Sequence, residues 1–313
     1  GYVLFITFFI YFNLGLFGAM LCQILISGIA GYCLFKIGSK IWNKNIGIVS
    51  LFIFLFYFPL QQWTFYILTD SLFMSLGVIG FYFLISKGSK LKSLFGIVLL
   101  VYTISLRPFG IIILPTLIFY FYLIIRNKNN LIYYLYIFLI FSSIAIAITL
   151  INRYFENLKI ITIFSRGDII WNYYSLQPPF EVSKYENQNN LYTLALLIFN
   201  YPKFFAEVFI HKIFWFFVRY RPYYSDLNNL ILISFSIYFY LFSILGILNN
   251  SKHKTIIFTF LVYIFLTMCS VALTVADWDG RFSLPILPFI VLFSSSGVVR
   301  FFQLIIKKYI KNY

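Results

Sequence analysis

The sequence predicts an all-α fold, a polytopic bundle of transmembrane helices. Of its 313 residues, 62% are hydrophobic and only 11% are charged, whereas a soluble domain carries about 25% charged residues. Apolar runs long enough to cross the hydrocarbon core of a bilayer recur along the chain. These runs are too long for barrel strands and do not alternate apolar with polar residues, so we expect helices.

Nine apolar runs are predicted as spans. In order, they cover residues 15–36, 46–68, 71–86, 92–107, 109–126, 131–152, 229–248, 255–276 and 283–306. A further apolar stretch at residues 2–13 is too short to cross the bilayer. Because the chain shows no repeat and no low-complexity linker, residues 1–313 are predicted to form a single membrane domain. One large outer loop, residues 153–228, is inserted between its spans.

The placement of lysine and arginine predicts the orientation in the membrane. One set of loops holds 14 of the 24 basic residues and none of the 9 acids. These are Lys36, Lys40, Lys44, Lys87, Lys90, Lys92, Arg126, Lys128, Lys252, Lys254, Arg300, Lys307, Lys308 and Lys311. Because basic residues gather on the cytoplasmic side, this set is predicted to be cytoplasmic. The net charge of +15 then reflects this asymmetry and an attraction to anionic membrane lipids, and we predict no nucleic-acid partner.

The second half of the large outer loop, which begins LYTLALLIFNYPKFFAEVFIHKIFWFF, is predicted to be a helix lying along the membrane surface. Pro202 suits the first turn of such a helix. Its polar residues recur at steps of three and four, namely Asn200, Lys203, Glu207 and His211. This face is either the water-exposed side of the helix or a contact for substrate or a divalent metal. Glu207 and His211, one turn apart, are the candidate metal ligands.

Charged residues lie at the ends of the predicted spans or in loops, never at span centres. Ion-coupled transporters usually need such groups near the bilayer midplane, so the distribution favours chemistry or binding at a membrane face. Three outer turns carry charges that we expect to converge on one cavity. They hold Asp70 in YILTDSL, Arg107 in SLRPFG, and Asp277, Asp279 and Arg281 in ADWDGRF. Carboxylates beside arginines suit a substrate with a hydroxyl to deprotonate and a phosphate to hold.

Asp70 and Arg107 also have purely structural interpretations. Aspartate is a favoured N-cap residue, so Asp70 can simply cap a helix that begins at Ser71. Arg107 can extend its side chain along apolar surface and hold its guanidinium at the membrane interface. These alternatives stay open beside the functional ones.

The other outer charges are open in the same way. Arg281 can neutralise Asp277 or Asp279 in a buried loop. The segment RYRPYYSD is either an aromatic anchor at the membrane interface or a place where Arg219 and Arg221 meet the phosphate of a lipid. Of the two acids, Asp279 stands nearer to the Gly-Arg pair of ADWDGRF and is the preferred catalytic candidate.

Four segments, in this order, carry a family resemblance: YILTDSLFMSLGVIGFYFL, IVLLVYTISLRPFGIIILP, LLIFNYPKFFAEVFIHKIFWFF and GRFSLPILPFIVLFSSSGV. They are similar to an outer-end acid followed by a helix, a Leu-(Thr/Ser)-x-Arg-Pro signature, a surface helix with an internal proline, and a last helix that opens Gly-Arg-(Tyr/Phe)-x-x-Pro-x-x-Pro. Together they resemble the membrane glycosyltransferases of the GT-C superfamily. The nearest branch is that of the protein O-mannosyltransferases and aminoarabinose transferases.

The resemblance implies that a sugar moves, with inversion, from a polyprenyl-phosphate-linked donor to a hydroxyl of a glycan, lipid or protein. It places the reaction at the outer face of a bacterial inner membrane. It also implies that Asp70 is the second acid of the site, and that Arg107 and Arg281 hold the lipid phosphate or shape the site. Family members carry another catalytic aspartate in a first outer loop, which this chain lacks, so we expect it to be incomplete at its N-terminus or inactive as it stands. No particular cofactor is predicted, and a divalent metal stays open.

Other functions compete with glycosyl transfer. A flippase or transporter of lipid-linked sugars shares the substrate, but the charge-free span centres speak against it. A polymerase or ligase of surface polysaccharide shares both topology and donor chemistry. A non-catalytic membrane subunit is the interpretation to adopt if the N-terminal aspartate is absent from the whole protein.

Overall fold

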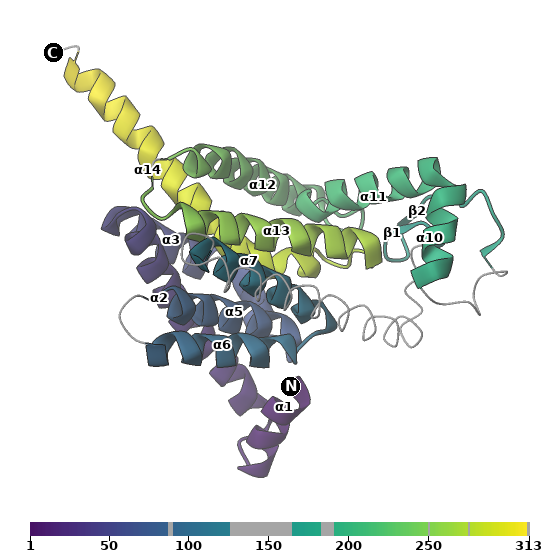
Figure 1. Ribbon diagram of the computed structural model, residues 1–313, viewed down its shortest axis with the longest axis horizontal. Helices are drawn as coiled ribbons and strands as arrows, with labels where there is room; N and C mark the ends of the chain where they lie inside the picture. Colours follow the sequence, from purple (N-terminus) through teal and green to yellow (C-terminus); the bar gives the residue numbers. More distant parts are fainter. Residues whose placement is uncertain (87–89, 126–164, 183–190, 250, 275, 312–313) are drawn as a thin grey trace. The chain divides into compact units, whose positions relative to one another are not determined.

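The computed structural model describes residues 1–86, 90–125, 165–182, 191–249, 251–274 and 276–311, and the apolar runs within these residues form helices (Figure 1). The first half holds α1 (Tyr2–Tyr11), α2 (Gly15–Ile41), α3 (Lys44–Phe56), α4 (Phe58–Gln61), α5 (Thr69–Ile85), α6 (Lys90–Ile104) and α7 (Ile113–Ile125), with 3-10 turns η1 (Gln62–Thr64) and η2 (Pro108–Ile112). The second half holds β1 (Asp168–Ile170), β2 (Tyr174–Ser175), α10 (Leu191–Asn200), α11 (Pro202–Phe217), α12 (Asp226–Ile247), α13 (Lys254–Thr274), the 3-10 turn η4 (Arg281–Ile286) and α14 (Leu287–Lys311).

Five helices of the described chain are long and apolar enough to cross a membrane. They are α2, η2 with α7, α12, α13, and η4 with α14. Two bent helix pairs raise the number to seven if each pair is one span. The chain thus has the long apolar helices of an integral membrane protein. The count of nine spans stays a prediction, and its run at 131–152 lies outside the described residues.

The predicted span 46–68 is not one straight helix, because the chain bends by 63° between α3 and α4. Pro59 explains the break, since proline lacks an N–H and its ring clashes with the carbonyl one turn earlier. The break frees a backbone carbonyl of α3, and the Gln61 side chain donates to it, with 2.7 Å between Nε2 and the Phe54 oxygen. The Ser27 hydroxyl in turn donates to Gln61 Oε1 at 2.9 Å, which ties the bend to α2.

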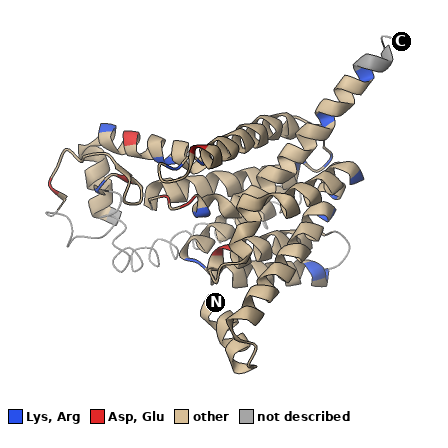
Figure 2. Ribbon diagram, turned by 180° about the vertical axis from the view of Figure 1, so that it is seen from behind, with Lys and Arg blue, Asp and Glu red and all other residues tan. Residues whose placement is uncertain are grey.

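The chain divides into two compact units, which are described separately. Unit 1 comprises residues 1–114, 234–264 and 284–313, and unit 2 comprises residues 115–233 and 265–283. Figure 2 shows that the long helices are almost free of charged residues between their ends, with α11 and the far part of α14 as exceptions.

Aromatic rings fill the core of unit 1. Phe81 of α5, Phe260 and Tyr263 of α13 and Phe289 of α14 are all buried. The Phe260 and Phe289 ring centroids lie 4.4 Å apart, and Phe81 meets Phe289 edge to face at 5.6 Å. Offset and edge-to-face pairs add stabilisation beyond the area that they bury. These rings therefore fix α5, α13 and α14 against one another.

Two glycines let α12 and α14 meet at their backbones within unit 1. A Cβ on Gly246 would lie 1.8 Å from the Phe293 carbonyl oxygen, and a Cβ on Gly297 would lie 1.9 Å from the Phe242 carbonyl oxygen. Small residues permit such close helix approach, which membrane helices use for packing. The crossing would have to open if either glycine gained a side chain.

The predicted surface helix of the large loop is two helices, because α10 and α11 meet at 105°. Tyr201 separates them with φ −130° and ψ 54°, as a residue before proline avoids the helical region. Pro202 opens α11, as predicted. Leu197 of α10 and Val208 of α11 are buried in the angle between the two helices. Asn200 accordingly ends α10 and does not share a helix with Glu207 and His211, so the predicted four-residue face is wrong at its first member.

Candidate functional site

The predicted site residues fall in two clusters, one in each unit. Asp70 and Arg107 belong to unit 1. Unit 2 holds the other group: Arg219, Arg221, Asp277, Asp279 and Arg281. Each cluster is built from segments far apart in the sequence, and the expected common cavity stays a prediction.

Asp70 and Arg107 form a buried ion pair. The Arg107 Nη1 donates to Asp70 Oδ1 over 2.5 Å, and the two side chains are 7% and 0% exposed. Arg107 precedes Pro108, which holds it in an extended conformation, with φ −146° and ψ 146°. Asp70 lies in the first turn of α5, where the helix dipole favours a negative charge. Local backbone rules thus position both partners.

The structure supports neither of the two structural interpretations of these residues. The helix begins at Thr69 with Leu68 at the N-cap position, so Asp70 is not its cap. Arg107 is buried against Asp70, so its guanidinium does not extend to an interface in this conformation. A buried pair of this kind costs free energy to desolvate and is often kept for reasons other than stability.

In unit 2 the acidic segment ADWDGRF pairs with the β1–β2 hairpin. The Asp277 amide donates to the Ile169 carbonyl at 2.8 Å, and the Trp171 amide donates to the Asp277 carbonyl at 3.1 Å. Two residues later the backbone enters the left-handed region, with φ +52° at Asp279 and +67° at Gly280. Aspartate and glycine tolerate this region better than most residues. The strand contact and the left-handed turn together aim the two carboxylates in different directions.

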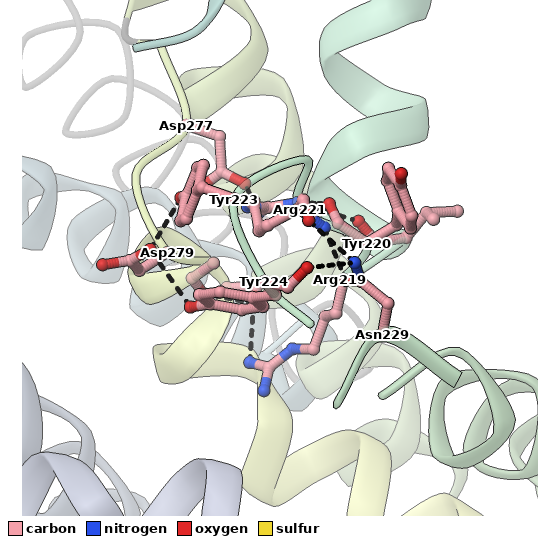
Figure 3. A network of polar contacts seen from close by, with 11 residues as sticks. Arg219, Tyr220, Arg221, Tyr223, Tyr224, Asn229, Asp277 and Asp279 are labelled. Carbon is pink, nitrogen blue, oxygen red and sulfur yellow. Dashed lines mark hydrogen bonds and ion pairs between the residues drawn. The ribbon is translucent and has the colours of Figure 1, made fainter. Parts of the chain in front are cut away.

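Arg221 lies at the centre of the cluster that Figure 3 shows. It is almost fully buried, and its Nη2 donates to the Asp277 carboxylate. Its Nη1 donates to the Tyr220 and Val218 carbonyls at 2.6 and 3.2 Å. Asn229 clasps its backbone, accepting from the Arg221 amide at 2.9 Å and donating to its carbonyl at 2.8 Å. Arg221 therefore holds the segment after α11 to Asp277.

Asp279 is held by two tyrosines. Tyr223 and Tyr224 both donate to its Oδ1, at 2.6 and 3.1 Å (Figure 3). No described residue binds Oδ2, and the side chain is half-buried. Burial together with the Asp279 charge raises the pKa of Tyr224 to about 12 and raises the pKa of Tyr223 as well. The result is a carboxylate that is fixed through one oxygen, while no described residue binds the other.

Two further arginines belong to the same cluster in unit 2. Arg219 is buried, and its Nη2 donates to the Ser283 hydroxyl at 3.1 Å. Its Nε has no hydrogen-bond partner among the described residues. The Arg281 guanidinium lies over the Trp278 ring, 4.7 Å from its centroid. Burial raises the pKa of Asp277, while the charges of Arg221 and Arg219 oppose that rise. Of the two acids that Arg281 was expected to neutralise, Asp277 accepts from Arg221 in the structure.

The Glu207–His211 pair gains no third ligand in the described chain. Glu207 is exposed, whereas His211 is half-buried with its Nδ1 3.4 Å from the Tyr174 hydroxyl. Among the described residues, no three His, Cys, Asp or Glu side chains are grouped to hold a metal ion. The proposed metal site stays a prediction.

Several residues in and near the unit 2 cluster were not predicted from the sequence. Tyr223 and Tyr224 contact an acid 56 and 55 residues away, respectively, and no local spacing signals such a contact. Lys212 is buried on the inner side of α11, near Asp168 of β1. Burial raises the pKa of Asp168, and the charges of Arg166 and Lys212 lower it again. The position of Lys212 within an otherwise apolar stretch of α11 was the sequence feature that could have indicated its burial.

The described fold and its two polar clusters define an integral membrane protein of the all-α class with ionisable groups at helix ends. A scan of protein-family models and searches of curated proteins and of solved structures each found no match to the chain.

Proposed function

We propose that this protein is a glycosyltransferase that moves a sugar from a polyprenyl-phosphate-linked donor to a hydroxyl acceptor. The reaction takes place at the outer face of a bacterial inner membrane, and the acceptor is a glycan, a lipid or a protein. The order of the four GT-C-like sequence segments supports this proposal, and so does the cluster in unit 2.

One observation carries the proposal: Asp279 is fixed through Oδ1, no described residue binds its Oδ2, and arginines belong to the same cluster. Tyr223 and Tyr224 fix the carboxylate through Oδ1, and its backbone is held in the left-handed region. Sparsely populated backbone conformations cluster at functional sites, where surrounding structure maintains them. Arg219 lies within the same loop pair with a buried Nε that no described residue satisfies. A base beside an arginine donor is the arrangement that transfer from a phosphate ester needs.

The chemistry balances with these groups. The acceptor oxygen attacks the anomeric carbon and forms the new glycosidic bond. The bond between that carbon and the donor phosphate oxygen breaks, and its electron pair leaves on the phosphate. The acceptor proton passes to Asp279. Charge that builds on the departing phosphate is stabilised by arginine N–H groups, which match phosphate oxygens in geometry.

The residues take separate roles in this proposal. Asp279 is the proton acceptor, and Arg219 and Arg281 are the donors to phosphate. Arg221 is a positioning residue, because its guanidinium already donates to Asp277 and to two backbone carbonyls. Asp70 keeps its proposed role as the second acid, with Arg107 as its partner. In this conformation that carboxylate is enclosed, so proton transfer is assigned to Asp279 first.

The test is a transfer assay with the full-length protein in membrane vesicles. A panel of radiolabelled polyprenyl-phosphate sugars is supplied, and label is followed into protein, lipid and glycan fractions. We expect label in one acceptor fraction. Because general base catalysis contributes about 10²- to 10⁴-fold, Asp279→Asn is expected to lower the rate by at least about 100-fold. Asp226→Asn, at the exposed start of α12, is the matched control and should leave the rate unchanged.

Two results would count against the proposal in different ways. Normal transfer by Asp279→Asn would remove the assigned base while leaving the activity standing. Label that stays on the carrier lipid with every donor would remove glycosyl transfer itself. Growth of long labelled chains, in place of single additions, would identify a polysaccharide polymerase.

The buried Asp70–Arg107 pair favours one second candidate, a flippase of lipid-linked sugars. Ionisable residues inside helical membrane domains commonly mark substrate pathways. Movement of a lipid-linked sugar across proteoliposomes that lack any acceptor, abolished by Asp70→Asn, would support that function over transfer.

A further inference from the structure

In unit 2, exposed aromatic rings lie beside the contact between the β1–β2 hairpin and the segment ADWDGRF. Ile170 and Asp277 face each other in a parallel bridge, and both are buried. Side chains alternate between the two faces of a sheet, so the next residue of each strand points to the open face. Those residues are Trp171 and Trp278, which are 52% and 53% exposed. The bridge therefore brings two tryptophans from distant segments to one exposed face.

A chain of contacts joins these rings to the candidate base. Tyr173 is exposed, and its ring centroid lies 4.5 Å from that of Tyr223. Tyr223 in turn donates to Asp279 Oδ1, and Figure 3 shows the other carboxylate oxygen pointing away from both tyrosines. The Arg281 guanidinium covers one side of the Trp278 ring. The three exposed rings, Trp171, Tyr173 and Trp278, are termed the aromatic shelf.

We propose that the aromatic shelf binds the pyranose ring of a carbohydrate, with Asp279 Oδ2 accepting from its hydroxyls. This inference deepens the proposed function and rests on it, since it names the sugar subsite of the same cluster. One face of a pyranose presents C–H groups of slight positive charge, and the face of an aromatic ring is negative. Sites that are mostly aromatic with a few fixed polar groups are typical of small-molecule recognition.

The polar groups favour a sugar over a lipid interface as the occupant. A tryptophan that anchors a protein at the membrane interface needs only apolar surroundings for its ring and water for its N–H. It does not require a carboxylate oriented by two hydroxyls. Both tips of the shelf also carry non-glycine residues in the left-handed region, Asn172 at φ +60° and Asp279 at φ +52°. Such conformations cost free energy and persist where the surroundings impose them, which an anchor would not need.

Saturation-transfer NMR tests the proposal directly. Full-length protein in lipid nanodiscs is mixed with methyl glycosides of several hexoses and pentoses, and the protein's aromatic protons are irradiated. We expect transfer to the C–H protons of one face of a pyranose. Trp278→Ala should lower the transfer by about tenfold, and Trp278→Phe should retain most of it, because a ring is kept. Asp279→Asn should weaken binding while the contacted face stays the same.

Phe199→Ala is the matched control, because Phe199 is an aromatic residue of unit 2 that is 83% exposed on α10. Its removal should leave the sugar signal unchanged. Equal signals from the wild type, Trp278→Ala and Phe199→Ala would overturn the proposal. So would the absence of signal for every glycoside, together with quenching of Trp171 and Trp278 fluorescence by brominated phospholipid, which would show an interfacial anchor.

The NMR and transfer experiments together distinguish a failure of sugar binding from a failure of glycosyl transfer. A sugar signal that depends on Trp278, in a protein that transfers no label, would keep the carbohydrate shelf and remove the glycosyltransferase. Transfer that proceeds normally in Trp278→Ala, with no sugar signal in the wild type, would remove the shelf alone.

Discussion

The Arg107 guanidinium donates to the Asp70 carboxylate over 2.5 Å, and neither side chain has more than 7% of its surface exposed. The pair joins the first turn of α5 to the residue before η2, two places that are 37 residues apart. An ion pair that is this well enclosed makes the stability of unit 1 depend on both partners together.

Removal of one partner of this pair should destabilise the protein more than removal of both. Arg107→Met leaves a buried carboxylate uncompensated and is expected to cost about 3–5 kcal/mol. The double variant Asp70→Leu/Arg107→Met should recover most of that loss, because no buried charge is left. Thermal unfolding in detergent can be followed with a thiol-reactive dye, since Cys33 is 3% exposed in the folded state. Equal losses for the single and double variants would contradict this account of the pair.

The α12–α14 crossing predicts opposite effects for two glycine substitutions. Gly246→Ala places a Cβ 1.8 Å from a backbone oxygen of α14, so the helices must separate, at a cost of about 1–3 kcal/mol. Gly77→Ala in α5 meets nothing within 4 Å and should stabilise the protein by about 0.5–1 kcal/mol through helix propensity. Both changes are read as shifts in the unfolding midpoint. A stabilising effect of Gly246→Ala would show that the helices do not cross at their backbones.

Gln61 is predicted to support the bend between α3 and α4. Gln61→Ala leaves the Phe54 carbonyl without its side-chain donor, and an unsatisfied buried polar group costs about 1–3 kcal/mol. The neighbouring Gln62 donates to the Pro59 carbonyl at 3.5 Å and has no other side-chain partner among the described residues, so Gln62→Ala is the control and should have little effect. Chemical denaturation of the two variants in the same detergent compares them. Similar losses would mean that Gln61 has no special role.

Asp279 is predicted to control the ionisation of Tyr224. Burial, together with the Asp279 charge, raises the pKa of Tyr224 to about 12, so Asp279→Asn should lower that pKa part of the way toward its ordinary value near 10, while the effect of burial is kept. NMR of protein labelled with ¹³C at tyrosine Cζ gives the titration, and Tyr224→Phe assigns the signal. An unchanged titration in Asp279→Asn would remove the electrostatic contact.

The same raised pKa sets a pH dependence of stability. A group whose pKa is higher in the folded state stabilises the fold below its unfolded pKa. That contribution is lost as the pH rises from about 10 through about 12. The folded protein should therefore lose stability over this range, and Tyr224→Phe should lose less of it over the same pH steps.

The helices were largely predictable, and the contacts between loops were not. A long apolar run in a membrane must satisfy its backbone hydrogen bonds within its own helix. This requirement does not depend on which other helices pack beside it. The bend at Pro59 and the angle at Pro202 each interrupt an apolar run that hydrophobicity alone would predict to be one continuous helix. The proline chemistry that explains both breaks is local and was visible in the sequence.

The partners of the acids depend on three-dimensional packing. Nearness in sequence left open that Arg281 neutralises Asp277 or Asp279. In the structure, a left-handed turn at Asp279 and Gly280 precedes Arg281, whose guanidinium lies over Trp278. Asp277 is then free to meet Arg221, 56 residues away. A pattern of residue types along the chain contains no information about which loop reaches which carboxylate.

The pairing of Asp277 with the hairpin has a mechanical consequence. Hydrogen bonds run from Asp277 to Ile169 and from Trp171 to Asp277, so the hairpin and the acidic loop share a backbone junction. Any ligand that pushes on the tip of the hairpin transmits that force directly to the peptide that precedes Trp278 and Asp279. We therefore expect the two segments to move together, so that a displacement of the exposed Trp171 also displaces the Asp279 carboxylate.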